Sequence, residues 1–503
     1  MGDYLLGIDA GTTALKAVLY NEHGHAVGSA TEEYRLLTPE PDYVELDARA
    51  YWDACARCLR RIMDSTEVSG DRVKALAISS QGETCVPVDD HGEPLRNAMV
   101  WLDNRASAQA ENVKDRFGVE RVYHTSGSHE IVPCWGGIKM MWIKENEPEI
   151  FDKAAKLLLV EDFLIHKLTG RFIGETALYC STLMMDITSG TWWDEFLAFA
   201  GIPREKLVDL LAPGEIVGPL TAEAAKATGL SPSTMVVTGG MDQACGSVGS
   251  GNITPGRVTE TTGASLNICA TTTRPVFDPE YRMPCQVHAV QDAYILLPWC
   301  QTAGMTLKWF RDAFCEIELS NAARRGKDSY DLMTAQVATV PPGSDGLIML
   351  PHLAGSMCPK SNPRAQGVFF GVTLGTTKGH FIRAIMESIA FMLRENLDAM
   401  AELGIVSDSI ISLGGASRSR LWTQIKADVL GKPVTILADP ETACLGAAIL
   451  AGKATGVFAS IEEACASMVS AKRTVRPNPA RREVYDRNYE TYRKLYASVE
   501  PLF

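Results

Sequence analysis

An acidic residue followed by a glycine and two hydroxyl residues stands near the start of the chain, between two apolar runs. The stretch LLGIDAGTTALKAVLY (residues 5–20) places Asp9 just before Gly11, Thr12 and Thr13. A plain hairpin favours Asn-Gly or Asp-Gly in a two-residue loop. Backbone N–H groups and hydroxyls beside a carboxylate instead suit phosphate oxygens and a magnesium ion. Because Gly-Thr turns also occur in ordinary sheets, this turn alone leaves both interpretations open.

A similar turn recurs in the second half of the chain. In GRVTETTGASLNICATTT (residues 256–273), two β-type runs meet at Thr261, Thr262 and Gly263. A single Gly-Thr turn can be incidental, but two in matching places favour a pair of phosphate-binding turns around one polyphosphate.

A further carboxylate follows a glycine bend. STMVVTGGMDQACGSVGSG (residues 233–251) predicts a buried strand, a Gly-Gly bend and a helix of small residues that opens with Asp242. A carboxylate exposed at a strand end can accept a proton from an attacking hydroxyl. Asp also caps helices, and the two roles are compatible.

Composition indicates a globular protein of at least two domains. The chain has 503 residues, is 46% hydrophobic and 22% charged, and carries a net charge of −13. That charge disfavours nucleic acid and anionic membranes as partners, and no run of 18 apolar residues predicts a membrane span. The start Met1-Gly2-Asp3 lacks signal-peptide features. The thirteen cysteines, odd in number and scattered in apolar segments, predict a reduced cytoplasmic enzyme. Cys55 and Cys58 form a lone C-x-x-C that favours core packing over zinc.

Strands alternate with helices along the chain, which predicts an α/β architecture. Helices are expected at about residues 48–65 and 377–403, the second with a buried face of Ile382, Ile385, Ile389, Leu393 and Leu397. PETACLGAAILAG (440–452) predicts a helix with Ala and Gly at close-contact positions. The pattern restarts after residue 252, so two domains are expected, at 1–252 and 253–503.

These motifs resemble those of the FGGY carbohydrate kinases, within the actin-like ATPase superfamily, over nearly the whole chain. GIDAGTTALKAVLY resembles the first phosphate turn, GGMDQACGSVG the catalytic-base segment, and GVFFGVTLGTTKGHFIRAIMES the second family signature, with His380, Ala384 and Glu387 in place. KMMWIKEN resembles the end of the first signature, with Lys139 and Trp142 in place, whereas Cys134 and Gly136 depart from its usual front.

The resemblance implies two actin-like domains of ribonuclease-H type with a central cleft, and phosphoryl transfer from MgATP to a hydroxyl of a small sugar or polyol. It implies Asp9 as the magnesium residue and Asp242 as the base, which also contacts the sugar. ATP would be bound by residues of both domains: Gly11, Thr12, Thr13, Thr262, Gly263, Gly304, Lys308, Gly414, Gly415 and Ser419. Gly304 also has a simpler explanation as a helix-packing residue.

The resemblance places the sugar on two loops, SSQGET and VWLDNR, with contacts from Gln81, Glu83, Trp101 and Asp103. Trp101 also fits a core residue. Where glycerol kinases have a phenylalanine and an arginine, this chain has Ser265 and Gly82, which predicts a wider, more polar pocket. The expected acceptor is therefore a ketopentose such as xylulose, with glycerol, another polyol or a sugar acid as the alternative.

Two further classes stay open: an actin-like regulatory or scaffold ATPase, and a sugar sensor without turnover. Asp242 and the polar loop at 79–84 disfavour the scaffold, since a scaffold needs no acceptor base. Intact Asp9, Thr12 and Gly263 disfavour the sensor. The sequence leaves the oligomeric state open, with a homodimer as one option.

Overall fold

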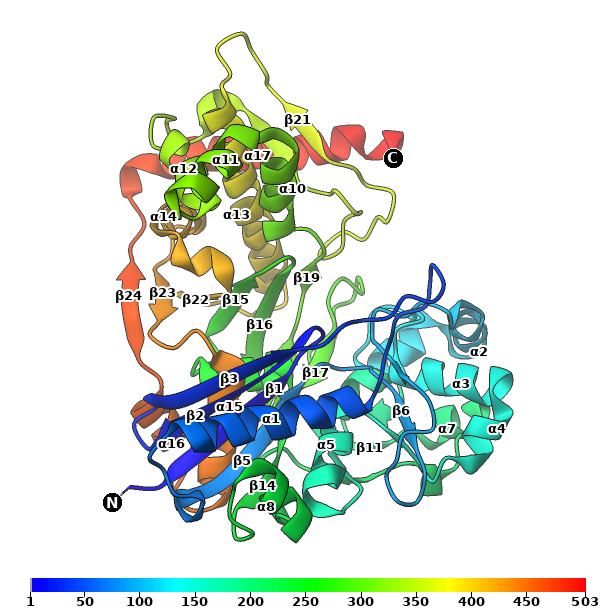
Figure 1. The fold of residues 1–503 in the computed structure, drawn as a ribbon. Coiled ribbons are helices and arrows are strands. Elements are labelled where there is room, and N and C mark those ends of the chain that lie inside the picture. The colour runs from blue at the N-terminus through cyan, green and yellow to red at the C-terminus, as the bar shows by residue number, and fades with distance from the viewer. Residues whose placement is uncertain (1) are drawn as a thin grey trace.

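Two mixed β-sheets organise the chain into two domains, one above the other in Figure 1. The structure, a computed structural model, describes residues 2–503. The first sheet has the strand order β13-β14-β5-β1-β2-β3, with the strands β1 (Tyr4–Ala10), β2 (Ala14–Asn21), β3 (Ala26–Glu33), β5 (Val73–Ser80), β13 (Ile216–Pro219) and β14 (Met235–Met241). The second has the order β17-β18-β16-β15-β22-β23-β24, with β19 beside β16; its strands are β15 (Val258–Thr262), β16 (Leu266–Thr272), β17 (Cys285–Val287), β18 (Tyr294–Leu296), β19 (Trp299–Cys300), β22 (Ile410–Leu413), β23 (Val434–Leu437) and β24 (Ala471–Val475).

The two sheets repeat one arrangement. In the first, β1 forms an antiparallel hairpin with β2 and runs parallel to β5. In the second, β15 forms an antiparallel hairpin with β16 and runs parallel to β22. Each predicted phosphate turn is the bend of its hairpin, so the predicted α/β class and the internal repeat are both confirmed.

Helices cover the faces of the sheets. Those of the first half are α1 (Arg49–Ser65), α2 (Ser107–Ser126), α3 (Gly136–Asn146), α4 (Pro148–Lys153), α5 (Val160–Thr169), α6 (Thr176–Tyr179), α7 (Asp194–Ala200), α8 (Ala222–Thr228) and α9 (Asp242–Gly249). Those of the second half are α10 (Gly304–Phe314), α11 (Glu316–Arg325), α12 (Ser329–Val337), α13 (Lys378–Glu402), α14 (Arg420–Leu430), α15 (Thr442–Ala454), α16 (Ile461–Met468) and α17 (Arg482–Val499).

The two helices predicted from periodicity are confirmed as α1 and α13. Four of the five expected core residues of α13 are buried, and Leu397 is half-buried. Cys55 and Cys58 pack in the core side of α1, and burial raises the pKa of the Cys58 thiol to about 11. The core interpretation of the C-x-x-C motif is therefore confirmed.

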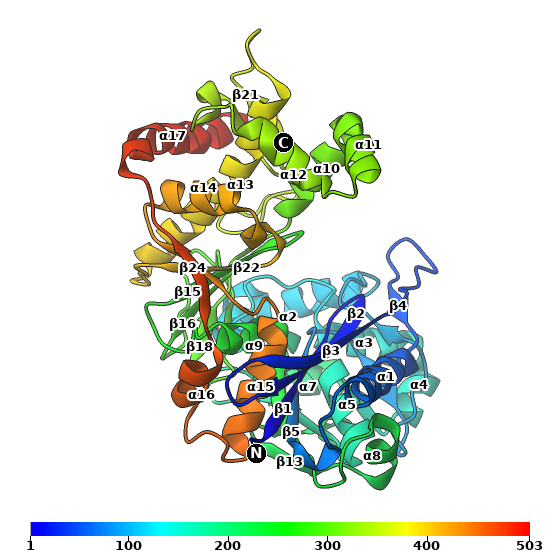
Figure 2. The ribbon, with the colours of Figure 1, turned by 60° about the vertical axis from the view of Figure 1, so that its left-hand side comes forward.

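Helix α15 crosses back from the second half of the chain to the first sheet. Figures 1 and 2 show it, in orange, beside the blue strand β1, and α16 lies beyond it. The contact depends on missing side chains: a Cβ on Gly446 would lie 1.8 Å from the carbonyl oxygen of Cys245, and one on Gly7 would lie 1.8 Å from that of Cys444. The predicted small-residue contacts are confirmed, and they pack α15 on the first sheet although it lies beyond the expected boundary at 252/253.

Within residues 2–503, none of the helices combines the length and the apolar character that crossing a membrane requires.

Candidate active site

The first phosphate turn joins β1 to β2 and is held through Gly11. The Gly11 N–H donates to the Ala14 carbonyl at 3.1 Å, and the Gly11 carbonyl accepts from the Tyr34 hydroxyl and from Gln81 Nε2. Both polar groups of Gly11 are thus used inside the protein, which leaves the tip residues Thr12 and Thr13 to face a ligand. Gly11 was expected to bind phosphate directly, and the structure gives it a supporting position instead.

Gln81 also supports this turn. Its Nε2 donates to the Gly11 carbonyl and to the Tyr51 hydroxyl, both at 3.0 Å, and its Oε1 accepts from the Thr84 hydroxyl at 3.1 Å. The side chain is 4% exposed. Because both amide hydrogens are already donated, the sugar contact predicted for Gln81 stays a prediction that these bonds disfavour.

Trp101 reaches the tip of the same turn. Its indole Nε1 donates to Thr12 Oγ1 at 2.8 Å, which leaves the Thr12 hydroxyl hydrogen free to donate elsewhere. The ring is half-buried, packed against the core on one side. Trp101 therefore packs on the core, as one of its two predicted roles requires, and its role as a wall for the sugar stays a prediction.

Three carboxyl groups interact electrostatically near the turn: Asp9 at the end of β1, Glu83 on the loop after β5, and Asp242 at the first position of α9. Burial raises the pKa of Asp9 to about 6, and the Ser79 hydroxyl, 3.0 Å from Oδ1, opposes that shift. Burial raises the pKa of Glu83 to about 7. Burial, together with the charges of Asp9 and Glu83, raises the pKa of Asp242 to about 8.

This arrangement fits a magnesium ion that keeps most of its waters. Within residues 2–503, no three His, Cys, Asp or Glu side chains lie close enough to enclose a metal ion. Magnesium commonly uses one or two carboxylates together with substrate phosphates, rather than a closed protein cage. Asp9 and Asp242 would offer hard oxygen ligands. The charges of Asp9 and Glu83 raise the pKa of Asp242, so a bound cation would offset repulsion among these carboxylates. The donor set therefore suits the cation that the sequence predicts at Asp9.

The carboxylate of Asp103 is bonded inside the protein, which disfavours its predicted sugar contact. It is fully buried and accepts from the Val44 N–H at 2.7 Å, from the Arg105 N–H at 3.1 Å and from the Arg105 guanidinium at 2.6 Å. Arg105 in turn lies 3.6 Å from the centre of the Tyr43 ring. The oxygens of Asp103 thus hold the loop around Arg105 and do not face a ligand.

Two lysines that sequence reasoning did not assign to the site lie beside its carboxylates. Lys139 is fully buried on α3 and donates to the carbonyls of Val100 at 2.7 Å and Glu83 at 3.2 Å; burial lowers its pKa to about 8. Lys16 is the cross-strand neighbour of Asp9 and forms an ion pair with Glu441 at 2.5 Å. A signal for Lys139 existed, because a single lysine interrupts the apolar run GGIKMMWI.

The front of the first signature lies near Glu83. The charge of Glu83 contributes to the raised pKa of the Cys134 thiol, and burial is the larger cause. Gly82 is buried, and a Cβ placed there would lie 3.1 Å from Ser181 Oγ and 3.5 Å from Met241 Sδ. A side chain at this position would therefore crowd Ser181, and the extra room expected beside Gly82 stays a prediction. Ser265 is half-buried, with Oγ 3.4 Å from Asn267 Nδ2.

The second phosphate turn is formed by close backbone contacts between three elements. The Gly304 N–H, at the start of α10, donates to the Gly263 carbonyl at 3.0 Å, and a Cβ on Gly304 would lie 2.3 Å from that oxygen. Gly414 has φ +76°, and its Cβ would lie 2.7 Å from the Thr262 carbonyl. The simpler explanation of Gly304 as a packing residue thus holds, and the packing partner is the turn itself.

Three further predicted nucleotide residues surround this turn. Gly415 has open space around its Cβ position. Ser419 caps α14 by accepting from the Trp422 N–H at 3.2 Å. Lys308 is exposed on α10, pairs with Asp312 at 2.8 Å, and lines a surface hollow with Met305 and Trp309. All three lie on elements that also contact Thr262 or Gly263.

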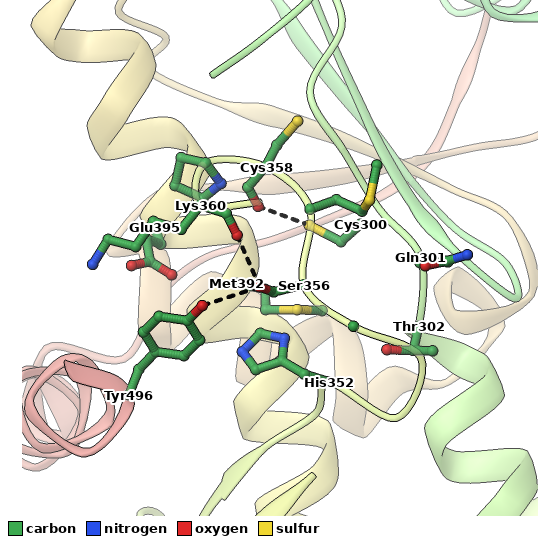
Figure 3. A pocket seen from close by; sticks show the side chains of 13 residues that line it. Cys300, Gln301, Thr302, His352, Ser356, Cys358, Lys360, Met392, Glu395 and Tyr496 are labelled. Atoms are coloured by element: carbon green, nitrogen blue, oxygen red, sulfur yellow. Dashed lines mark hydrogen bonds between the residues drawn. The ribbon is translucent and has the colours of Figure 1, made fainter. Parts of the chain in front are cut away.

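A second hollow lies inside the second domain, away from these residues. It is lined by the strand end at Cys300, the loop 352–360, α13 and α17 (Figure 3). Ser356 binds the Tyr496 hydroxyl at 3.1 Å across it. None of the predicted site residues lines it, so it forms no part of the candidate active site.

Comparison with known proteins places this geometry in a family. The model of the FGGY family of carbohydrate kinases, N-terminal domain, matches residues 4–249, and the C-terminal domain model matches residues 261–455. The chain belongs to the FGGY family of carbohydrate kinases.

Relatives in this family match over almost their whole length. A xylulose kinase of Staphylococcus epidermidis is 30% identical over 500 residues, which cover 99% of this chain and 98% of the relative. A gluconokinase of Bacillus subtilis is 31% identical over 508 residues, covering 100% and 95%. The crystal structure of a xylulose kinase from Rhodospirillum rubrum superposes with a TM-score of 0.91 at 27% identity and covers 99% of both chains. The two-domain actin-like fold is thereby confirmed, and the protein is a carbohydrate kinase.

Proposed function

We propose that this FGGY kinase transfers the γ-phosphoryl group of MgATP to a hydroxyl of a neutral five-carbon sugar or polyol, first among them a ketopentose such as xylulose. One observation carries the choice of a neutral acceptor: the site presents three carboxyl groups, and the cations beside them are already engaged. Lys139 is bound to two carbonyls and Lys16 to Glu441. A substrate carboxylate, as in gluconate, would add a further negative charge to a site in which Lys139 already offsets the charge of Glu83.

The phosphate chain of ATP would lie between the two turns, on Thr12 and Thr13 from the first sheet and on the Gly263 turn from the second. Phosphoryl transfer depends on positioning and charge neutralisation more than on covalent chemistry. Bound Mg²⁺, held by Asp9, would supply much of that neutralisation. Lys16, opposite Asp9 on β2, lies on the same face of the sheet, where its ion pair with Glu441 holds it.

Asp242 would act as the base that accepts the proton of the attacking hydroxyl. It stands where β14 ends and α9 begins, and its Oδ1 accepts from the Gln243 N–H at 2.8 Å. The charges of Asp9 and Glu83 increase its basicity, which strengthens a carboxylate as a proton acceptor. Glu83 would accept hydroxyl protons of the sugar in hydrogen bonds, and Trp101 would flank the sugar.

The predicted preference for a five-carbon acceptor depends on Ser265, which aligns with a phenylalanine of glycerol kinases. A small hydroxyl side chain leaves room and a polar group where that phenylalanine packs on a three-carbon chain. A buried polar group left unpaired costs roughly 1–3 kcal/mol, so a five-carbon substrate that pairs it is favoured over glycerol.

A coupled ADP-release assay with MgATP tests the proposal over D-xylulose, D-ribulose, a pentitol, glycerol and D-gluconate. We expect the highest kcat/KM for a pentulose or pentitol, and the lowest for gluconate. A higher value for gluconate would overturn the charge argument, and a higher value for glycerol would overturn the argument from Ser265. ATP hydrolysis that no acceptor accelerates would support a regulatory ATPase instead.

We place the reaction in the cytoplasm, since all thirteen cysteines are free thiols.

A further inference from the structure

A buried ion pair lies directly beneath the second phosphate turn. Lys426, on α14, donates to Glu260 Oε1 at 2.6 Å and to Thr262 Oγ1 at 2.8 Å. The Thr262 hydroxyl donates to Glu260 Oε2 at 2.6 Å, and Ser412 on β22 donates to Glu260 Oε1. Lys426, Glu260 and Thr262 are each at most 1% exposed. The four side chains therefore link β15, β22 and α14 in one closed network.

The network holds the turn at its first residue. Glu260 and Thr262 alternate along β15, so both side chains lie on the face covered by α14. The Thr262 hydroxyl has given its hydrogen to Glu260 and accepts one from Lys426, so it has none left for a phosphate. The hydroxyl contact predicted for Thr262 is thus replaced by an internal one, and any contact with ATP falls to the backbone of the turn.

We propose that Lys426 is a positioning residue for the β- and γ-phosphates of ATP, acting through Glu260 and Thr262 on the Gly263 turn. This rests on the proposed nucleotide site. Above the network, Gly263 and Gly415 have open space around their Cβ positions. The backbone that faces this space is fixed on one side by the start of α10 and from below by Lys426.

Stability alone does not explain the pair. Replacing a buried ion pair by apolar residues of similar size is often neutral or stabilising, and α14 already has an apolar buried face that includes Trp422 and Ile425. What the ion pair adds is direction: the bonds from Lys426 to Thr262 and from Thr262 to Glu260 fix the Thr262 side chain, and with it the start of the turn.

The test compares binding of ADP with binding of AMP by calorimetry. AMP carries the adenosine and one phosphate, whereas ADP adds the β-phosphate that reaches the turn. Wild-type protein is compared with the double variant Lys426→Met/Glu260→Gln, which removes both charges, and with Thr262→Val, which cuts the link but keeps the pair. Arg383→Met is the matched control, because Arg383 forms a similarly buried pair with Glu387 on α13, at 2.7 Å.

We expect both test variants to bind ADP about tenfold more weakly, a loss of ~1.4 kcal/mol in binding free energy. Their affinity for AMP should be unchanged. The control is expected to melt at a lower temperature with an unchanged ratio of ADP to AMP affinity. An unchanged ratio in the double variant would overturn the inference and leave the network as core packing. Wild-type protein that binds no ADP would overturn the proposed function itself. If the double variant does not fold, Thr262→Val still tests the inference, because it keeps the ion pair and removes only the bonds of the Thr262 hydroxyl.

Discussion

The two phosphate turns share a hairpin but are supported by different chemistry. The first is held at Gly11 by neutral donors, the hydroxyl of Tyr34 and the amide of Gln81, and it stands beside three carboxyl groups. The second is held at Thr262 by a buried ion pair and by two glycine contacts. In the proposed mechanism this difference separates the tasks: proton transfer and the magnesium residue would belong to the first turn, and rigid placement of the phosphate chain to the second.

The largest expected effect tests the acid–base side of this division. Asp242→Asn should lower kcat by about 10²–10⁴-fold with little change in sugar affinity, because the amide keeps the shape but accepts no proton. Its melting temperature should not fall at pH 8, since the replaced carboxylate is destabilised by burial.

Asp194→Asn is a matched control, because Asp194 is likewise the first residue of a helix, α7, but is exposed and paired with Arg204. Equal, small losses of turnover in both variants would show that Asp242 only starts a helix.

The second effect is a pH dependence. The base works when deprotonated, and the pKa of Asp242 is raised to about 8. We therefore expect kcat/KM for the sugar to rise about tenfold per pH unit below that value and to level off above it. Removing the charge of Glu83 by Glu83→Gln should move this limb to lower pH.

Glu402→Gln, at an exposed ion pair with Arg282, should leave the limb in place. A limb at pH 4, or one that Glu83→Gln moves upward, would contradict the electrostatic coupling. Because the three carboxyl groups interact, the measured pKa belongs to the group as a whole.

The third effect concerns the second turn. Gly414→Ala should lower the free energy of unfolding by about 1–3 kcal/mol, because the methyl group meets the Thr262 carbonyl and φ is positive. Gly415→Ala should change it by less than about 0.5 kcal/mol, since its Cβ position is open.

Urea unfolding measures both values. If Gly415 lies against the nucleotide, its variant should bind ADP more weakly at unchanged stability. Equal stability losses in the two variants would refute the geometric difference between these neighbours.

The smallest effect distinguishes support from substrate contact in the first turn. Gln81→Met removes the bonds to Gly11, Tyr51 and Thr84. We expect KM for ATP to rise several-fold while KM for the sugar stays nearly constant. Gln109→Met, at a buried glutamine bonded to Glu145, should change neither. A rise in the KM of the sugar alone would restore Gln81 as a substrate residue.

Local patterns in the sequence predicted the turns well, because a hairpin bend and a strand end are set by neighbouring residues. The positions of Asp9, Asp242 and Gly263 follow from such patterns. The roles of Gln81, Asp103 and Gly82 do not, since a polar residue beside a site can equally support the loop that carries it. Only the partners distinguish the two cases: Tyr51 for Gln81, Val44 for Asp103.

Contacts between residues far apart in the sequence could not be predicted either. Lys426 in LWTQIKADVL has the spacing of an ordinary amphipathic helix, and its partner Glu260 is 166 residues away. The packing of α15 on the first sheet joins residues from opposite ends of the chain, such as Gly7 and Cys444. No local periodicity encodes such a partner, so the expected division at residue 252 reflects the repeat and carries no information on this crossing.

The packing of α15 on the first sheet determines when the core of the first domain can be completed during synthesis. A ribosome emits the chain from its N-terminus at about 5–20 residues per second. The strands from β1 to β14 emerge early, but the apolar surface that α15 covers stays open until Ala454 has left the exit tunnel. The nascent first domain thus waits through the translation of nearly the whole second half. A chain that ends at residue 300 should therefore bind chaperones or a hydrophobic dye, and the full chain after its release from the ribosome should not.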